Sequence, residues 1–248
     1  MLPSFLVDGL KVTAVTVEEA AEVISAGLQR GAGSAVFTMN LDHVVKIRRN
    51  AAFAAAYARA GLILPDGFPI VLAGRLQGIT ARRATGADLI VPLCRAAARD
   101  DLPIALVGST SEALAGAARR LEAEAPNLRM VARIAPPHGF EPLSPDADAL
   151  IQEIKASGAK ICFLAFGAPK QELLADRAAA QLPDVAFLCI GAGLDFLAGQ
   201  QRRAPKLLQK TGLEWVWRLA LAPRRLGARY LACLGVLPSV LVGAVARR

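Results

Sequence analysis

The chain has 248 residues, of which 54% are hydrophobic, and a formal net charge of +8. This length is enough to bury a full hydrophobic core, and the mean hydropathy of +0.40 is high for a soluble protein, which leaves membrane contact open. The four cysteines form no Cys-x-x-Cys pair and the N-terminus lacks a signal-peptide pattern, so the sequence indicates a reduced, cytosolic protein and argues against an exported one.

Buried-strand patterns alternate with helical patterns along the first 201 residues. A capping box formed by Thr16 and Glu19 predicts a first helix that ends at Gly31. Apolar runs that end in Gly, Pro or Asn predict strands at 34–40, 61–67, 102–110, 128–134, 159–167 and 185–193. Helical spacing predicts helices over 41–61, 88–101, 111–125 and 144–158. Strands without polar alternation, separated by helices, are typical of a parallel sheet covered on both faces, so we predict a Rossmann-like α/β domain over residues 1–201.

The carboxyl ends of the predicted strands are polar or rich in glycine, and ligands bind outside that edge of such sheets. These ends lie at 38–40, 65–67, 108–110, 167–172 and 191–195. Asp66 follows one strand directly, and its carboxylate is ionised at neutral pH and can serve as a general base. The alternative is that Asp-Gly simply forms a turn at this position.

The segment GAPKQE at 167–172 joins an apolar strand to a helix start. Pro169 suits the first turn of a helix, where free N–H groups favour an anion, and Gly167 lets that anion approach the backbone. Gln171 could then bond a base or a sugar, and Glu172 could accept hydroxyl protons. The alternative is a strand-to-helix turn with a favourably placed Glu.

Three other patterns do not predict sites. The segment GAGLDF at 191–196 begins like a dinucleotide fingerprint but lacks the third glycine. Asp146 and Asp148 have the spacing of metal-dependent glycosyltransferases, yet they lie at a helix start, where capping is the simpler role. His43 and His138 have no partner at ligand spacing, so we expect neither a metal nor a cofactor.

Residues 202–248 carry the whole excess of positive charge. They contain ten basic residues and one acid, Glu214, whereas residues 1–201 sum to −1. We predict a helical appendage in which aromatic and basic residues flank an apolar run at 231–246, shorter than the roughly 20 residues that span a bilayer. This pattern favours a segment lying on a membrane surface over a transmembrane helix. Nucleic-acid binding is open on charge, but because no recognition motif accompanies it we expect no nucleic-acid partner.

Taken in order, these stretches resemble the WecG/TagA/CpsF family, glycosyltransferase family 26. The motifs that carry the resemblance are Thr38-x-Asn40, Pro65-Asp66-Gly67, Arg83-x-x-Gly86-x-Asp88, Gly167-Ala168-Pro169-Lys170-Gln171-Glu172, Gly191-x-x-x-Asp195, Arg203-Ala204-Pro205, Glu214-Trp215, Arg218-Leu219, Arg224-Arg225 and Arg229-Tyr230. The resemblance implies an inverting, metal-independent transferase in cell-surface polysaccharide synthesis. Its implied donor is a UDP-sugar, with a hexose or N-acetylhexosamine of the ManNAc, ManNAcA or glucose type. Its implied acceptor is a polyprenyl-diphosphate-linked saccharide at the cytoplasmic face of the cell membrane.

The resemblance also implies roles for individual residues. Asp66 is the implied base, and Thr38 lies with it at the implied catalytic centre. The residues implied to bind substrate are Asn40, Arg83, Gly86, Asp88, Gly108, Gly167, Pro169, Lys170, Gln171, Glu172, Gly191, Asp195, Arg218, Arg225 and Arg229. Arginines of the tail offset the diphosphate charge in place of a metal in this interpretation. A non-catalytic nucleotide-sugar-binding or membrane-surface protein is the alternative, and association between copies of the chain is left open.

Overall fold

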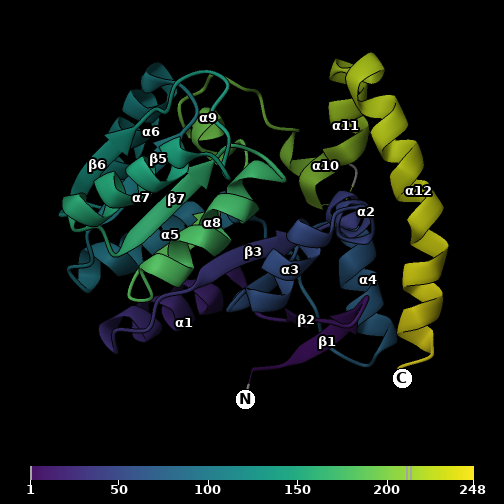
Figure 1. The fold of residues 1–248 in the computed structure, drawn as a ribbon. Coiled ribbons are helices and arrows are strands. Elements are labelled where there is room, and N and C mark those ends of the chain that lie inside the picture. The colour runs from purple at the N-terminus through teal and green to yellow at the C-terminus, as the bar shows by residue number, and fades with distance from the viewer. Residues whose placement is uncertain (1, 211, 213) are drawn as a thin grey trace.

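The computed structural model describes residues 2–210, 212 and 214–248, without the side chains of residues 206, 210, 218 and 225. Within the described residues, six parallel strands form one sheet in the order β4-β3-β8-β7-β5-β6 (Figure 1). These strands are β3 (Ala35–Met39), β4 (Leu62–Pro65), β5 (Ile104–Gly108), β6 (Met130–Ile134), β7 (Ile161–Ala165) and β8 (Ala186–Cys189). The predicted Rossmann-like α/β fold is confirmed, and each predicted strand is present.

Helices cover both faces of the sheet. They are α1 (Val17–Gln29), α2 (Leu41–Arg49), α3 (Ala51–Arg59), α4 (Phe68–Leu76), α5 (Gly86–Arg99), α6 (Ser111–Glu124), α7 (Pro145–Ser157), α8 (Lys170–Gln181) and α9 (Gly193–Leu197). The core has two halves, one shared by the sheet with α3, α7 and α8 and the other with α1, α5 and α6. Within β3, Phe37 and Met39 face the first half and Val36 faces the second, as the two-residue period of a strand requires.

Local sequence signals explain where the first helices begin and end. The capping box is confirmed, because the Thr16 hydroxyl accepts from the Glu19 N–H at 3.1 Å and Glu19 accepts from the Thr16 N–H at 2.8 Å. The single helix predicted over 41–61 is wrong. Asn50 adopts an extended backbone (φ −134°, ψ 106°) and its side chain accepts from the Phe53 N–H at 3.0 Å, so it ends α2 and caps α3.

An antiparallel hairpin precedes the first helix and was not predicted. It consists of β1 (Ser4–Val7) and β2 (Leu10–Thr13), joined by a turn at Asp8 and Gly9. Both turn residues have a positive φ, 49° and 80°, which matches the two-residue turns that favour Asp-Gly. The hairpin packs against β4 and α4 at the edge of the sheet.

The tail forms the predicted helical appendage outside the sheet, made of α10 (Lys206–Lys210), α11 (Glu214–Leu221) and α12 (Pro223–Val245). α12 lies along α2 and α4 at one side of the molecule (Figure 1). Its inward stripe consists of Leu226, Cys233, Val240 and Ala244, which are buried. Val240 and Ala244 belong to the same buried cluster as the sheet residues Phe37 and Met39. The last helix therefore packs as part of the core.

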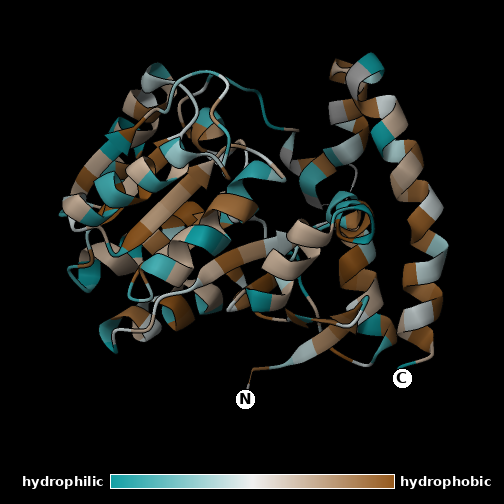
Figure 2. Cartoon of the chain, in the orientation of Figure 1, coloured by the Kyte–Doolittle hydropathy of each residue, from teal (hydrophilic) through white to brown (hydrophobic). Residues whose placement is uncertain are grey.

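The opposite side of α12 is apolar and exposed. Leu231 and Val242 are each 70% exposed, and Leu234 and Val245 are each 56% exposed. Figure 2 shows hydrophobic residues, in brown, at positions along the whole length of this helix. Within the described residues, the 20 residues Leu226–Val245 form the one helix long and apolar enough to cross a membrane by length and composition, with a mean hydropathy of 1.7. This apolar helix is longer than the apolar run at 231–246 that was predicted from the sequence, because it already begins at Leu226.

Candidate active site at the carboxyl edge of the sheet

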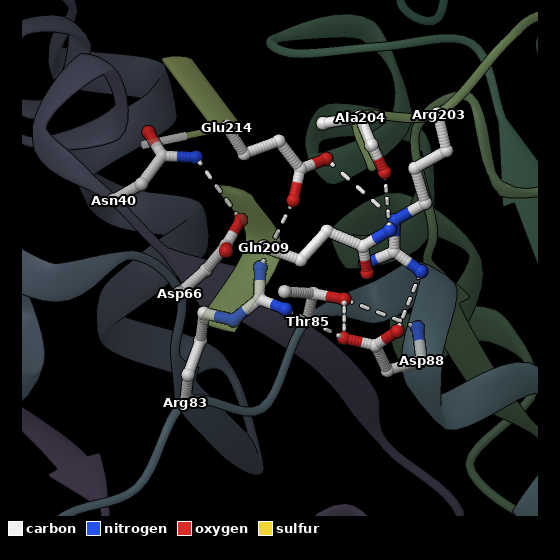
Figure 3. Close-up of polar contacts among 9 residues, drawn as sticks. All are labelled: Asn40, Asp66, Arg83, Thr85, Asp88, Arg203, Ala204, Gln209 and Glu214. Carbon is white, nitrogen blue, oxygen red and sulfur yellow. Dashed lines mark hydrogen bonds and ion pairs between the residues drawn. The ribbon is translucent and has the colours of Figure 1, made fainter. Parts of the chain in front are cut away.

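Asp66 and Asn40 lie side by side where β4 and β3 end (Figure 3). The two strands are in parallel register, and the Asp66 N–H donates to the Met39 carbonyl at 2.8 Å. The Asn40 amide donates from Nδ2 to Oδ2 of Asp66 at 3.3 Å. Its Oδ1 accepts from the His43 N–H at 3.1 Å and thereby caps α2. Because the cap occupies the amide oxygen, the amide nitrogen faces Asp66.

The electrostatic surroundings of Asp66 suit a base. Burial raises the pKa of this carboxyl, and the hydrogen bond from Asn40 and the charge of Arg83 lower it in part. The carboxylates of Glu214 and Asp88 raise it further. A carboxylate whose pKa lies above its usual value is a stronger base when it is ionised.

Beside Asp66, four described side chains of alternating charge form a closed ring (Figure 3). Arg83 lies 3.1 Å from Glu214 and 3.5 Å from Asp88. Arg203 lies 2.6 Å from Asp88 and 3.6 Å from Glu214. Arg83 and Asp88 come from the segment around the start of α5, whereas Arg203 and Glu214 come from the tail. The ring therefore joins the appendage to the edge of the sheet, and its two arginines are neutralised by its two carboxylates.

The start of α5, which carries Asp88 of the ring, packs closely against the end of β8. Thr85 caps the helix by accepting from the Asp88 N–H at 3.1 Å, and its hydroxyl donates to the Asp88 carboxylate at 2.8 Å. A Cβ on Gly86 would lie 2.6 Å from the Cys189 carbonyl oxygen, so glycine is required there for the close approach of helix and strand. Gly108 is required for a similar reason, since a Cβ would lie 2.8 Å from the Ala165 carbonyl oxygen.

Thr38 is buried one residue before the end of β3, and its backbone is tightly held. Its carbonyl accepts from the Tyr57 hydroxyl at 2.6 Å and lies 2.7 Å from Nδ1 of His43. Burial lowers the pKa of His43 to about 4, so its imidazole is neutral at pH 7. This neutral, satisfied histidine anchors the strand end that carries Thr38 and Asn40.

Side-chain hydrogen bonds join the loops that follow β7 and β8 at the carboxyl edge of the sheet. Gln171 accepts from the backbone N–H groups of Gly167 and Gly191, and its amide donates to Glu172. Ser109, after β5, donates to Asp195, which also accepts from Gln201 at 2.7 Å. Hydrogen bonds therefore link the segments that follow β5, β7 and β8.

A family model described as the Glycosyl transferase WecG/TagA/CpsF family matches residues 5–248, nearly the whole chain. The chain belongs to this family. A WecG/TagA/CpsF protein is a glycosyltransferase of cell-surface polysaccharide synthesis, with a nucleotide-sugar donor and a saccharide acceptor. The carboxyl edge of its sheet is the candidate site for that transfer, because the polar strand ends gather there.

The structure shows contacts with neighbouring segments of the chain for two residues that the resemblance implies, Lys170 and Arg229. Lys170 donates to the Phe140 carbonyl at 2.9 Å and pairs with Glu141 at 2.7 Å, so it holds the loop before α7. Arg229 of α12 pairs with Asp42 in the first turn of α2. The side chains of Arg218 and Arg225 lie outside the described residues. Pro169 follows a cis peptide bond and immediately precedes α8.

Two members of the ring were missed as site residues of the WecG/TagA/CpsF enzyme. Arg203 and Glu214 carried the family resemblance but received no role from their own sequence context. Thr85 was also missed, although the spacing Thr-x-x-Asp up to Asp88 is a helix-start signal. For Arg203 and Glu214 no local signal exists, because their partners are far away in the chain.

Proposed function

We propose that the chain transfers a hexose or N-acetylhexosamine from a UDP-sugar to a polyprenyl-diphosphate-linked saccharide, with inversion at the anomeric carbon and without a metal. The observation that carries this proposal is Asp66, held by Asn40 at a strand end beside the guanidinium groups of Arg83 and Arg203. A base next to two cations is what a transfer reaction with an anionic leaving group requires.

In the proposed reaction Asp66 takes the proton of the acceptor hydroxyl. The hydroxyl oxygen attacks the anomeric carbon of the donor, and the bond from that carbon to the phosphate oxygen breaks as the new glycosidic bond forms. The electron pair of the broken bond leaves with UDP. A single displacement from the face opposite the leaving group inverts the configuration. Asn40 keeps the Asp66 carboxylate oriented while the proton moves.

The two ring arginines are proposed to bind the diphosphate. In the structure their charges are matched by Asp88 and Glu214, so the ring is preformed and neutral. In this proposal the phosphate oxygens take the place of the carboxylates of Asp88 and Glu214 on the two guanidinium groups, whose planar shape suits phosphate oxygens. This role replaces the charge that a divalent cation would otherwise supply. Because Arg203 belongs to the tail, the appendage takes part in the proposed donor site.

We also propose that the protein lies on the cytoplasmic face of the cell membrane through α12. Its inward stripe packs on the body, while Leu231, Leu234 and Val242 face outward and are exposed. The net charge of +9 over residues 202–248 adds attraction to anionic lipid. An outward apolar face with basic surroundings matches a helix that lies in the interfacial region. A lipid-linked acceptor is then reached without leaving the membrane.

The test is acceptor-dependent release of UDP. The purified full chain would be incubated with a panel of UDP-sugars, with and without a polyprenyl-diphosphate-linked saccharide, and free UDP would be measured. We expect release that requires the acceptor. The second candidate, a non-catalytic nucleotide-sugar-binding protein, rests on the same polar edge. It predicts UDP binding without acceptor-dependent release, so the two functions are separated by one assay.

A further inference from the structure

The first turn of α8 carries two polar side chains that are removed from solvent. Gln171 is 4% exposed and Glu172 is 0% exposed. Both were expected to hold the nucleotide sugar, but in the structure Glu172 lies below the surface of the candidate site. Buried polar groups are almost always hydrogen-bonded, and their partners indicate what they hold in place.

Gln171 links the two turns that follow β8 and β7. Its Oε1 accepts from the Gly191 N–H at 3.0 Å and from the Gly167 N–H at 3.3 Å. Both glycines have a positive φ, +56° and +73°, and a Cβ built on either would meet no described atom within 4 Å. The strands are neighbours in the sheet, so one amide oxygen sets the spacing between two adjacent turns at its carboxyl edge.

Glu172 fixes which way the Gln171 amide points. The amide nitrogen of Gln171 donates to Oε1 of Glu172 at 2.8 Å. An amide oxygen and nitrogen differ little in shape but have opposite hydrogen-bonding roles. With the nitrogen held by Glu172, the oxygen is left for the two backbone N–H groups. A flipped amide would set its nitrogen against both of them.

The surroundings of Glu172 favour its neutral form. Among the described residues no group hydrogen-bonds to its second oxygen, Oε2. Burial raises the pKa of Glu172 to about 7, an effect that the hydrogen bond from Gln171 reduces in part. Of the charged groups on α2, Lys46 lowers this pKa and Asp42 raises it.

The titratable groups facing Glu172 from the other packed elements are Tyr57 on α3 and Cys189 on β8. Burial, and then the Glu172 carboxylate, raise the pKa of both groups, so both stay protonated and uncharged at pH 7. At neutral pH a proton on Glu172 avoids an unpaired charge in the interior.

We propose that Gln171 and Glu172 are positioning residues that hold the turns at Gly167 and Gly191 in the arrangement that binds the nucleoside diphosphate of the donor. This rests on the proposed function for the identity of the ligand. The pair acts through the two turns and does not touch the donor. Glutamine is then an adequate substitute at position 172, whereas glutamate is not adequate at position 171.

The experiment compares three isosteric variants of the full chain, with UDP as the probe. Gln171→Glu replaces the amide nitrogen by an oxygen that faces Glu172. Glu172→Gln keeps the acceptor and removes the charge. Gln181→Glu is the matched control, because it makes the same change on the same helix at an exposed side chain that contacts Asp148. We expect the Kd for UDP, measured by calorimetry at pH 7, to rise by about tenfold or more in Gln171→Glu, as loss of a well-made buried hydrogen bond predicts. We expect Gln181→Glu to bind UDP as the unmodified chain does, and Glu172→Gln to bind UDP at least as tightly as the unmodified chain.

Two further measurements keep the proposal open to refutation. From pH 6 to 8.5 the unmodified chain should lose affinity for UDP relative to Glu172→Gln, because only the former can ionise at position 172. Amide exchange at Gly167 and Gly191 should be faster in Gln171→Glu than in the control.

The proposal is overturned if Gln171→Glu binds UDP normally, if Glu172→Gln is as damaged as Gln171→Glu, or if the two pH profiles run parallel. Should the unmodified chain bind no UDP, the proposed function fails. The positioning pair is then judged by amide exchange alone, and equal rates in Gln171→Glu and the control overturn it.

Discussion

Replacing Asn40 separates its two roles, because different atoms of one amide perform them. The side-chain oxygen caps α2, and the nitrogen donates to Asp66. Asn40→Asp keeps an oxygen for the cap but directs a second carboxylate at Asp66. Asn40→Ala removes both contacts. We therefore expect the two variants to differ in stability. We expect both to lose activity, but for different reasons.

The structure sets the expected magnitudes. Loss of an Asn cap costs about 1 kcal/mol, which lowers the Tm of a chain of this size by roughly 2–4 °C. In Asn40→Asp the two carboxylates stand within a few ångströms. Two like unit charges about 4 Å apart repel by about 4 kcal/mol at an effective dielectric of 20. That energy disfavours the doubly ionised pair by roughly a thousandfold, so the pair shares a proton at neutral pH.

A base that shares a proton is a poor base. We expect UDP release by Asn40→Asp to fall severalfold at pH 7, to fall further at pH 6 and to recover as the pH is raised, because ionisation of both groups restores Asp66. At pH 6, where the shared proton removes the repulsion, the Tm should match that of the unmodified chain within about 2 °C. The assay is initial UDP release from pH 6 to 9, with thermal denaturation at each pH.

Asn40→Ala serves as the control. It should lose the cap at every pH, and its activity should not recover at high pH as that of Asn40→Asp does. Wild-type turnover by Asn40→Asp at pH 7, or a loss that high pH does not relieve, would show that the amide nitrogen does not set the ionisation of Asp66.

Three other outcomes are expected. The pKa of Glu172 is raised to about 7 from 4.5, so the stability that its neutral form contributes is fully present below pH 4.5 and is lost as the pH rises through 7. Over this pH range the free energy of unfolding of Glu172→Gln, measured in urea, should therefore rise relative to that of the unmodified chain by up to about 3 kcal/mol. A difference that stays constant with pH would refute this assignment. Turnover should persist in EDTA, since Arg83 and Arg203 offset the diphosphate charge, and a collapse that Mg²⁺ or Mn²⁺ reverses would show that a metal is required. Double substitution Leu231→Glu and Val242→Glu on the outer side of α12 should release the protein from anionic vesicles in a flotation assay with an unchanged Tm, whereas undiminished binding would rule out this face as the membrane contact.

The sheet could be predicted from the sequence because its strands are buried on both faces. Continuous apolar runs that end in glycine or proline, as at Gly108 and Gly167, leave little choice of structure. The break between α2 and α3 was missed because Asn50 is neither glycine nor proline, and only its side-chain cap ends one helix and starts another. The N-terminal hairpin did have a sequence signal, because Asp8-Gly9 stands between two short apolar stretches.

The candidate site could be predicted in part. Parallel strands bring their carboxyl ends to one edge, so the proximity of Asp66 and Asn40 follows from topology. The sheet topology does not predict the ring of Arg83, Asp88, Arg203 and Glu214. Its two halves come from segments far apart in the chain and meet only when the tail folds back. The burial of Glu172 was also not evident, since the first turn of a helix can face ligand or core, and packing of α8 on the sheet decides between them.

Asp66 is proposed to be the base of an acceptor-dependent sugar transfer. The most direct test measures UDP binding and acceptor-dependent UDP release for the unmodified chain and for Asp66→Asn, which has the same size and no ionisable carboxyl. We expect both to bind UDP with similar affinity and only Asp66→Asn to lose turnover, by about 10² to 10⁴. Full turnover by Asp66→Asn, or no acceptor-dependent release by the unmodified chain with any UDP-sugar tested, would contradict this proposal.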